Sequence, residues 1–479
     1  MRQQPPLQES IERVLGDERR ALAEFLGRLE FQSWRQAGLA VICVVIAAAL
    51  SLLPEHPGLE SEGRYAFFIL LLAAGLWVSE AIPAYAVALL VVALEIMLLG
   101  DMGRSDHAQD WSRFVAPWAS PLLWLFIGGF VLGQAATRTG LDRWLAHTVL
   151  TLCGATPRRT LFGLMSVGFI LSMFMSNTAA AAMLLAIALP IARSCPPGDR
   201  ARKAVILGVA VATNLGGMAT LNGSPPNAIA AGALGGLDAF DFARWIMVGL
   251  PPALLLFAGS YALLVRLFPA ATEASLALPK LADAPRLPAW QHLIVIVVFA
   301  ATVLLWMTSS WHRIPSPIIS FLPITLFSAF GILRSEDVRA LPWDVLMLLL
   351  GGLALGLAVN ETGLASWIVG MLPISGFGRI ALALAAAYAA VVLSNFMSNT
   401  AATNILVPIG VALGAGSEAL VAVPIALSAS GAMCLAISTP PNAMAYATGE
   451  LETRDLLVTG LALAVVTPAV VVTWCALML

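Results

Sequence analysis

Charged residues are scarce in this chain of 479 residues. Only 11% of the sequence is charged, while 59% is hydrophobic and the mean hydropathy is +0.87. Soluble proteins carry about 25% charged residues. So few charges cannot cover a water-facing surface, and the composition therefore indicates an integral membrane protein in contact with the lipid bilayer. The net charge of -2 and the presence of only two lysines, Lys203 and Lys280, exclude the basic surface needed to bind nucleic acid.

Several kinds of chemical site are also missing. The five cysteines form no CxxC pair, which disfavours zinc, redox and disulfide roles and leaves them as small core residues. Neither HExxH nor a Walker loop occurs, so metalloprotease chemistry and ATP-driven transport are disfavoured. No Asp, Glu, Lys or Arg is centred in the polar membrane segments described below. Proton-coupled carriers commonly use such a residue or a histidine, so proton coupling is disfavoured too.

The first 35 residues are strongly charged and therefore do not fit a cleavable signal peptide. Within residues 1–35, apolar side chains recur at helical spacing, namely Ile11, Val14, Leu15, Leu22, Phe25, Leu26 and Leu29. This pattern predicts an amphipathic helix on the cytoplasmic membrane surface. An ordinary soluble helix fits the same pattern equally well.

The remaining sequence predicts an all-α membrane protein. A helix needs roughly 20 apolar residues to cross a bilayer. About eleven transmembrane helices are expected, at 36–53, 65–80, 83–100, 121–137, 204–232, 245–267, 288–308, 316–333, 343–359, 420–447 and 456–478. Two further apolar stretches, 160–192 and 375–412, are over thirty residues long and carry a polar cluster in the middle. Neither stretch is expected to cross as a single helix.

Positive charge indicates how these two stretches run. Basic residues flank the first stretch on both sides: Arg138, Arg143, Arg158 and Arg159 before it, and Arg193, Arg200, Arg202 and Lys203 after it. Because positive residues concentrate on the cytoplasmic side, both ends of 160–192 are expected there, and the stretch must turn back as a re-entrant hairpin. With eleven spans and two such hairpins, the N-terminus is expected in the cytoplasm and the C-terminus on the outside. The expected host membrane is the cell (inner) membrane. Thirteen full spans would instead put arginine-rich loops on alternating sides.

The sequence is duplicated internally. Residues 171–180 (LSMFMSNTAA) and 393–402 (LSNFMSNTAA) are identical at nine of ten positions. A glycine-rich segment precedes each copy, and a proline pair follows each, in NGSPPNAIA at 222–230 and ISTPPNAMA at 437–445. Under the predicted topology the two halves have opposite orientations. Inverted repeats with broken helices and a binding site at the midplane are typical of secondary transporters.

The repeated residues suit two kinds of ligand. Ser-Asn-Thr at 176–178 and 398–400 is expected at the hairpin tips, and the proline pairs are expected to break their spans because proline lacks a backbone donor. Hydroxyl, amide and freed carbonyl oxygens suit a hard cation such as sodium. Hydroxyl and amide donors, with the N–H groups of a helix start, suit a carboxylate. Alternatively, the polar residues only bind neighbouring helices together and the prolines only kink the spans.

Paired SNT and PPN motifs, with WVSEAIP at 77–83, resemble the divalent anion/sodium symporter family over nearly the whole chain. The resemblance implies a first sodium site formed by Ser172, Ser176, Asn177 and Gly223. It implies a second sodium site formed by Ser394, Met397, Asn399 and Ser438, where Ser394 replaces a threonine that other members can carry. It also implies substrate contacts from Asn177, Thr178, Ser224, Asn399, Thr400, Thr439 and Pro440.

The same resemblance implies a homodimer in which a transport part moves like an elevator against a scaffold. Residues 36–159 and 288–374 would belong to the scaffold, whereas 160–268 and 375–479 would carry the hairpins and broken helices. The implied activity is sodium-coupled symport of a four-carbon dicarboxylate such as succinate, malate or fumarate. Citrate or sulfate symport, sodium-independent exchange and an anion channel remain open alternatives. A membrane enzyme is disfavoured because no catalytic constellation is found.

Overall fold

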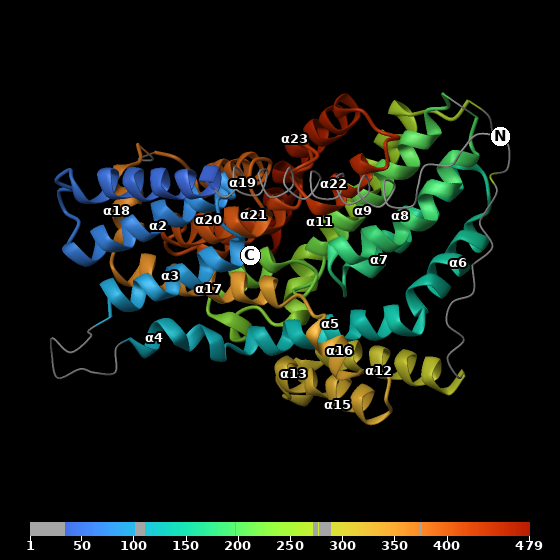
Figure 1. The fold of residues 1–479 in the computed structure, drawn as a ribbon, viewed down its shortest axis with the longest axis horizontal. Coiled ribbons are helices and arrows are strands. Elements are labelled where there is room, and N and C mark those ends of the chain that lie inside the picture. Colours follow the sequence, from blue (N-terminus) through green and yellow to red (C-terminus); the bar gives the residue numbers. More distant parts are fainter. Residues whose placement is uncertain (1–33, 101–110, 197, 272–275, 277–288, 374–375) are drawn as a thin grey trace, which may run out of the picture.

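The computed structural model of the protein describes residues 34–100, 111–196, 198–271, 276, 289–373 and 376–479. Every regular element within these ranges is a helix, and most helices run roughly along the long axis of the molecule (Figure 1). In this described part, eight helices are long and apolar enough to cross a membrane. The amphipathic helix expected over residues 1–35 falls almost entirely outside the described residues.

The first half of the chain begins with a helix over Trp34–Leu52. It continues with α2 (Ser61–Ser79), α3 (Ala84–Leu98), α4 (Ser112–Val115), the 3-10 helix η1 (Ala116–Ala119), α5 (Pro121–Thr139), α6 (Leu141–Cys153), α7 (Pro157–Ser172), α8 (Asn177–Ser194), α9 (Ala201–Met218), α10 (Pro225–Ala233), the 3-10 helix η2 (Gly236–Asp238) and α11 (Phe242–Leu267).

The second half contains α12 (Ala289–Met307), α13 (Ser309–His312), α14 (Ser316–Ile319), α15 (Phe321–Ala329), α16 (Ser335–Arg339), α17 (Trp343–Glu361), α18 (Leu364–Met371), α19 (Arg379–Ser394), α20 (Asn399–Leu413), α21 (Glu418–Ala429), α22 (Pro440–Ala447) and α23 (Thr453–Met478). The order α5 to α10 is repeated by α17 to α22, as the duplicated motifs indicate.

The repeat extends to backbone conformation. Gly140 follows α5 with φ 71°, and Gly363 occupies the matching place after α17 with φ 72°. This left-handed conformation is favourable for glycine because it has no Cβ, and it ends each long helix before a new one starts. In Figure 1, α7 and α8 lie in the right half of the molecule, whereas α19 and α20 lie in the left half.

Both long apolar stretches are interrupted at their polar clusters. A four-residue break separates α7 from α8, and another separates α19 from α20. The proline pairs also open new helices: α10 begins at Pro225 after a break from α9, and α22 begins at Pro440 after a break from α21. Proline is favourable at a helix start, where its missing N–H would have no intrahelical partner. The helices are thus interrupted at all four points that the sequence predicts.

The predicted span 316–333 differs from the structure, which has two short helices, α14 and α15, in this region. The helical part ends at Ala329 because Gly331 adopts φ 66° and the Ile332 N–H donates to the Phe327 carbonyl at 2.8 Å. This is the hydrogen-bond pattern of a glycine C-cap. The hydropathy of the segment continues beyond the glycine, which is why the sequence pattern overestimates the helix.

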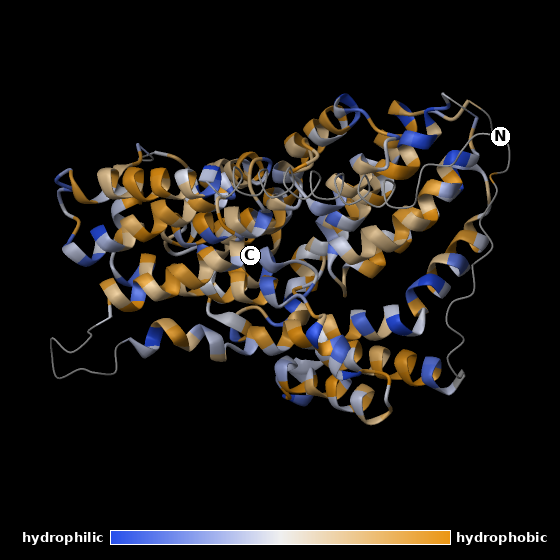
Figure 2. Cartoon of the chain, viewed as in Figure 1, coloured by the Kyte–Doolittle hydropathy of each residue, from blue (hydrophilic) through white to orange (hydrophobic). Residues whose placement is uncertain are grey.

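The exterior is apolar, as a protein dissolved in lipid requires. Large hydrophobic side chains are exposed on many helices, including Leu50, Leu152 and Leu461. Figure 2 shows hydrophobic residues along the helices and many of the hydrophilic ones near their ends. Inside, helices approach closely at small residues: a Cβ added to Gly216 on α9 would lie 2.3 Å from the Phe169 carbonyl oxygen on α7. Close backbone contact of this kind is typical of helix packing in membranes.

Asp337 joins α5 to α16 near their ends. Arg138 contacts its carboxylate, Gln134 donates to Oδ1 at 3.4 Å, and the Arg334 N–H donates to Oδ2 at 2.7 Å. Burial would raise the pKa of this carboxyl, but these hydrogen bonds and the charge of Arg138 hold it below its ordinary value. Asp337 is therefore ionised at neutral pH, and the pair connects a helix of the first half to the second half.

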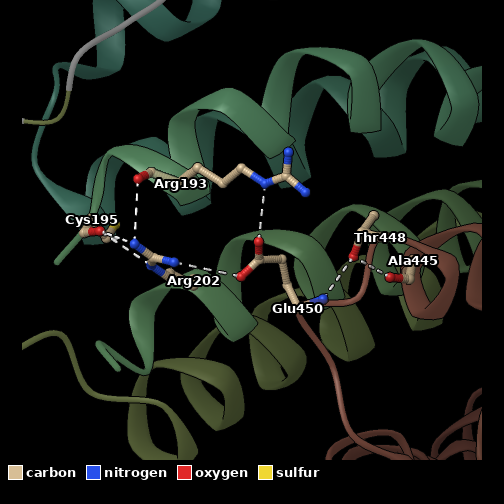
Figure 3. A network of polar contacts seen from close by, with 6 residues as sticks. All are labelled: Arg193, Cys195, Arg202, Ala445, Thr448 and Glu450. Carbon is tan, nitrogen blue, oxygen red and sulfur yellow. Dashed lines mark hydrogen bonds and ion pairs between the residues drawn. The ribbon is translucent and has the colours of Figure 1, made fainter. Parts of the chain in front are cut away.

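A second group of ion pairs connects the two halves at the ends of α8 and α9. Arg193 Nε lies 3.1 Å from Glu450 Oε1, and Arg202 Nη1 lies 3.8 Å from Glu450 Oε2 (Figure 3). Beside them, Lys203 Nζ lies 2.9 Å from Glu452 and 2.8 Å from Asp455. The short segment between α22 and α23, together with the first turn of α23, is thereby attached to the first half through six charged residues.

Replacing Glu450 with glutamine should weaken this attachment. Each exposed ion pair contributes about 0.2–1 kcal/mol and is screened by salt. We therefore expect Glu450→Gln to lower the melting temperature of the purified protein by about one degree in low salt, and by less in high salt. Glu55→Gln removes an exposed carboxylate without an ion pair among the described residues and serves as the control. Equal melting of both variants in low salt would refute the role of Glu450.

Candidate functional site

A serine and an asparagine contact each other across the break between α7 and α8. The fully buried Ser172 Oγ lies 2.5 Å from Asn177 Oδ1 and 2.7 Å from the Thr213 carbonyl oxygen on α9. A hydroxyl has one proton, so Ser172 satisfies both contacts only if the Asn177 amide is turned and its nitrogen donates to Oγ. Asn177 also lies against the backbone of α9, where a Cβ on Gly217 would be 2.5 Å from Oδ1.

The same two positions in the second half lack these bonds. Ser394 is fully buried, and neither Ser394 Oγ nor Asn399 Oδ1 has a hydrogen-bond partner among the described residues. A buried oxygen without a partner costs about 1–3 kcal/mol, so such atoms require an explanation. Two buried oxygens without partners beside one helix break suit a small hard cation that binds oxygen ligands. The donor set at the predicted second sodium site therefore fits sodium.

Serines cap the helices that begin at the two breaks. Ser176 Oγ accepts from the Ala179 N–H at 3.1 Å, and Ser398 Oγ accepts from the Ala401 N–H at 3.2 Å. Asn177 and Asn399 are consequently the first residues of α8 and α20, followed by Thr178 and Thr400. The N–H groups at these positions have no intrahelical partner. Thr178 is exposed whereas Thr400 is buried, so the two halves present their threonines differently.

The asparagines of the two PPN motifs donate hydrogen bonds to backbone carbonyls at the two proline breaks. Asn227 Nδ2 donates to the Gly217 and Thr220 carbonyls at 2.9 and 2.7 Å. Asn442 Nδ2 donates to the Met433 and Leu435 carbonyls at 3.0 and 3.3 Å. These carbonyls lie at or beyond the ends of α9 and α21, where no N–H of the helix can bond to them. The sequence analysis assigned no role to the two asparagines, although their recurrence after both proline pairs was the available signal.

The remaining predicted residues lie around these breaks. A Cβ on Gly223 would be 2.5 Å from the Gly217 carbonyl oxygen, so the backbone of the first break folds tightly beside Asn177. Ser224 is buried, and Ser438 Oγ donates to the Leu435 carbonyl at 2.7 Å. Met397 lies within its break, and Pro440 opens α22. Among the described residues, no hydrogen bond joins Met397 or Pro440 to Ser394 or Asn399.

In each half, a hydrogen bond joins the break at the SNT motif to the proline break, but different residues form it. In the first half, Thr220 Oγ1 donates to the Met173 carbonyl. In the second half, Asn395 Oδ1 accepts from the Cys434 N–H at 2.9 Å. Met173 and Asn395 occupy the single position at which the two ten-residue motifs differ. This mismatch, which sequence comparison alone leaves unexplained, changes which segment supplies the polar side chain.

One hydrogen-bond network joins the halves directly. Asn214, a buried residue of α9, donates from Nδ2 to Thr439 Oγ1 at 3.0 Å and to Asn442 Oδ1 at 3.3 Å. A residue of α9 in the first half and two residues at the start of α22 in the second half therefore meet around the Thr439 hydroxyl. No signal in the sequence singled out Asn214, because it lies outside every duplicated block.

Comparison with known proteins agrees with this arrangement. The sequence profile of the citrate transporter family matches residues 70–430. A sodium-dependent dicarboxylate transporter of Staphylococcus saprophyticus is 28% identical, over 93% of this chain and 92% of that protein. The protein of the same description from Staphylococcus aureus is 30% identical, over 86% of this chain and 85% of that protein.

Two solved transporter structures share the fold. The YdaH transporter of Alcanivorax borkumensis has a TM-score of 0.57 at 13% identity, covering 82% of this chain and 98% of that chain. MtrF of Neisseria gonorrhoeae has a TM-score of 0.53 at 11% identity, covering 84% and 96%. With its duplicated SNT and PPN breaks and these relatives, the chain is a membrane transport protein that belongs to the divalent anion/sodium symporter family.

Proposed function

We propose that the protein is a secondary active transporter that couples sodium entry to the uptake of a four-carbon dicarboxylate such as succinate, malate or fumarate. The observation that carries the proposal is the pair of oxygens on Ser394 and Asn399, which are buried at a helix break without a hydrogen-bond partner among the described residues. Relatives named as sodium-dependent dicarboxylate transporters support the choice of ion and substrate.

Sodium is proposed at one site in each half. The first site uses Ser172, Ser176, Asn177 and the Gly223 carbonyl, and the second uses Ser394, Asn399 and the Met397 and Ser438 carbonyls. The first site is supported by the contact between Ser172 and Asn177 and by the tight backbone at Gly223. In the first site a cation would replace the Ser172–Asn177 hydrogen bond, whereas in the second it would satisfy oxygens that otherwise lack a partner.

The anion is proposed to lie between the two helix starts. Asn177 and Thr178 would meet one carboxylate, Asn399 and Thr400 the other, with Ser224, Thr439 and Pro440 beside them. All of these are neutral groups, so attraction for the anion comes from oriented donors, from the positive ends of α8 and α20, and from the bound cations. Sodium would thus be part of the anion site as well as the source of energy.

Alternating access is proposed to follow an elevator mechanism. The stretches 160–192 and 375–412 would be re-entrant hairpins that enter the cell (inner) membrane from opposite sides, with the N-terminus cytoplasmic and the C-terminus outside. Their placement in opposite halves of the molecule supports this (Figure 1). Residues 160–268 and 375–479 would move against a scaffold of 36–159 and 288–374, which would also form a homodimer.

Uptake into liposomes tests the proposed function. Purified protein is reconstituted, and uptake of succinate, citrate and sulfate is measured with and without an inward sodium gradient. We expect saturable succinate uptake that requires sodium. Uptake unaffected by sodium would instead indicate an exchanger or a channel, and preference for citrate or sulfate would reassign the substrate.

Alanine at either tip asparagine should abolish transport. Asn177→Ala and Asn399→Ala each remove an amide that would contact both a sodium ion and a substrate carboxylate. We expect sodium-dependent uptake to fall to background while each variant elutes as a folded protein. Asn360→Ala, at an exposed asparagine at the end of α17, is the matched control and should transport normally. Normal uptake by either tip variant would contradict the assigned roles.

The two equivalent serines should respond differently to alanine. Ser172→Ala removes hydrogen bonds to α9 and to Asn177, each worth about 1 kcal/mol, so its melting temperature without sodium should fall. Ser394→Ala removes an oxygen that has no partner, so its sodium-free melting temperature should stay the same or rise. Added sodium should then stabilise Ser394→Ala less than the unmodified protein, because ligand binding stabilises the folded state. Equal losses without sodium in both variants would disprove this difference.

A further inference from the structure

Asn214 is a buried polar residue that none of the proposed ligand roles includes. It lies on α9 in the first half, 1% exposed, and contacts the proline break of the second half. The adjacent residue, Thr213, accepts the Ser172 hydroxyl through its carbonyl oxygen. Of these two neighbours on α9, Thr213 thus contacts Ser172 of the first proposed sodium site, and Asn214 contacts the Thr439 side chain.

The direction of each hydrogen bond around Asn214 is determined by the next one. Asn442 Nδ2 faces three acceptors, the Met433 and Leu435 carbonyls and Ser438 Oγ. Because only the nitrogen of an amide can donate to carbonyls, Asn442 Oδ1 must point away from them, toward Asn214. The nitrogen of Asn214 is the donor to that oxygen at 3.3 Å, so the Asn214 amide is fixed as well.

This orientation decides what the Thr439 hydroxyl can do. Thr439 Oγ1 accepts from Asn214 Nδ2 at 3.0 Å and from the Asn442 N–H at 3.3 Å. A hydroxyl has two acceptor lone pairs and one proton, so both lone pairs are occupied. Only the hydroxyl proton remains available to a ligand, so Thr439 can act toward that ligand only as a hydrogen-bond donor. An anion accepts such a bond, whereas a cation would be repelled by it.

We propose that Asn214 and Asn442 are positioning residues that make Thr439 an obligate hydrogen-bond donor to a substrate carboxylate. The inference rests on the proposed function, since it assumes that Thr439 faces the anion. Under this proposal, a residue on α9 of the first half orients the Thr439 hydroxyl of the second half, which in turn binds the substrate. It also explains a buried asparagine pair that spans 228 positions of the sequence.

The test compares Asn214→Leu, Thr439→Val and the double variant by the KM and the maximal rate of succinate uptake in saturating sodium. A hydrogen bond to a charged group is worth a factor of about ten or more. We expect each single variant to raise the KM about tenfold or more. The double variant should be no worse than Thr439→Val, because Asn214 acts through Thr439. Sodium alone should stabilise Asn214→Leu against heat as it does the unmodified protein, whereas succinate should stabilise it less.

Two further variants keep the test decisive. Asn214→Asp is nearly the same size but places an acceptor against Thr439, which would then donate to Asp instead of the substrate; its KM should rise at least as much. Asn404→Leu removes an equally buried asparagine that donates only to the Leu348 carbonyl, and its KM should change less than about twofold.

The outcomes separate this inference from the proposed function. If the unmodified protein transports succinate with sodium while Asn214→Leu or Asn214→Asp keeps its KM within about twofold, the positioning role is wrong. Effects of Asn214→Leu and Thr439→Val that multiply in the double variant would also overturn it, since the two residues would then act independently. Failure of the unmodified protein to take up succinate, citrate or sulfate would overturn the proposed function itself.

Discussion

Interrupted helices inside a hydrophobic molecule are the constraint on which the rest of this structure depends. A helix that stops in the membrane leaves carbonyls and N–H groups without partners, and lipid cannot satisfy them. Each interruption here has its own remedy: serines cap α8 and α20, and the two PPN asparagines bond to the carbonyls that the proline breaks release. Ser394 Oγ and Asn399 Oδ1 remain without a hydrogen-bond partner among the described residues.

Duplication produced two similar pairs of helix breaks, yet the chemistry of each half differs in detail. Ser172 is bonded, and its counterpart Ser394 is not. The hydrogen bond between the SNT break and the proline break involves a threonine side chain in one half and an asparagine side chain in the other.

Much of this arrangement was predictable from the sequence, because hydropathy and proline chemistry act locally. The four breaks follow from polar clusters and proline pairs, and the repeat follows from nearly identical ten-residue motifs. The end of α15 was not predicted, since a glycine C-cap rather than loss of hydropathy stops that helix. Asn214, Asn395 and the PPN asparagines were missed for a different reason: their partners are distant in the chain or are backbone atoms, which leave no pattern in composition or spacing.

The ion pairs at the ends of α8 and α9 have a consequence for how the protein is made. Arg193 precedes its partner Glu450 by 257 residues. At synthesis rates of about 5–20 residues per second, the first arginines therefore wait roughly 10 to 50 seconds before the carboxylate leaves the ribosome. During that interval the nascent first half must stay inserted without these contacts, so its completion is delayed until nearly the whole polypeptide has been translated.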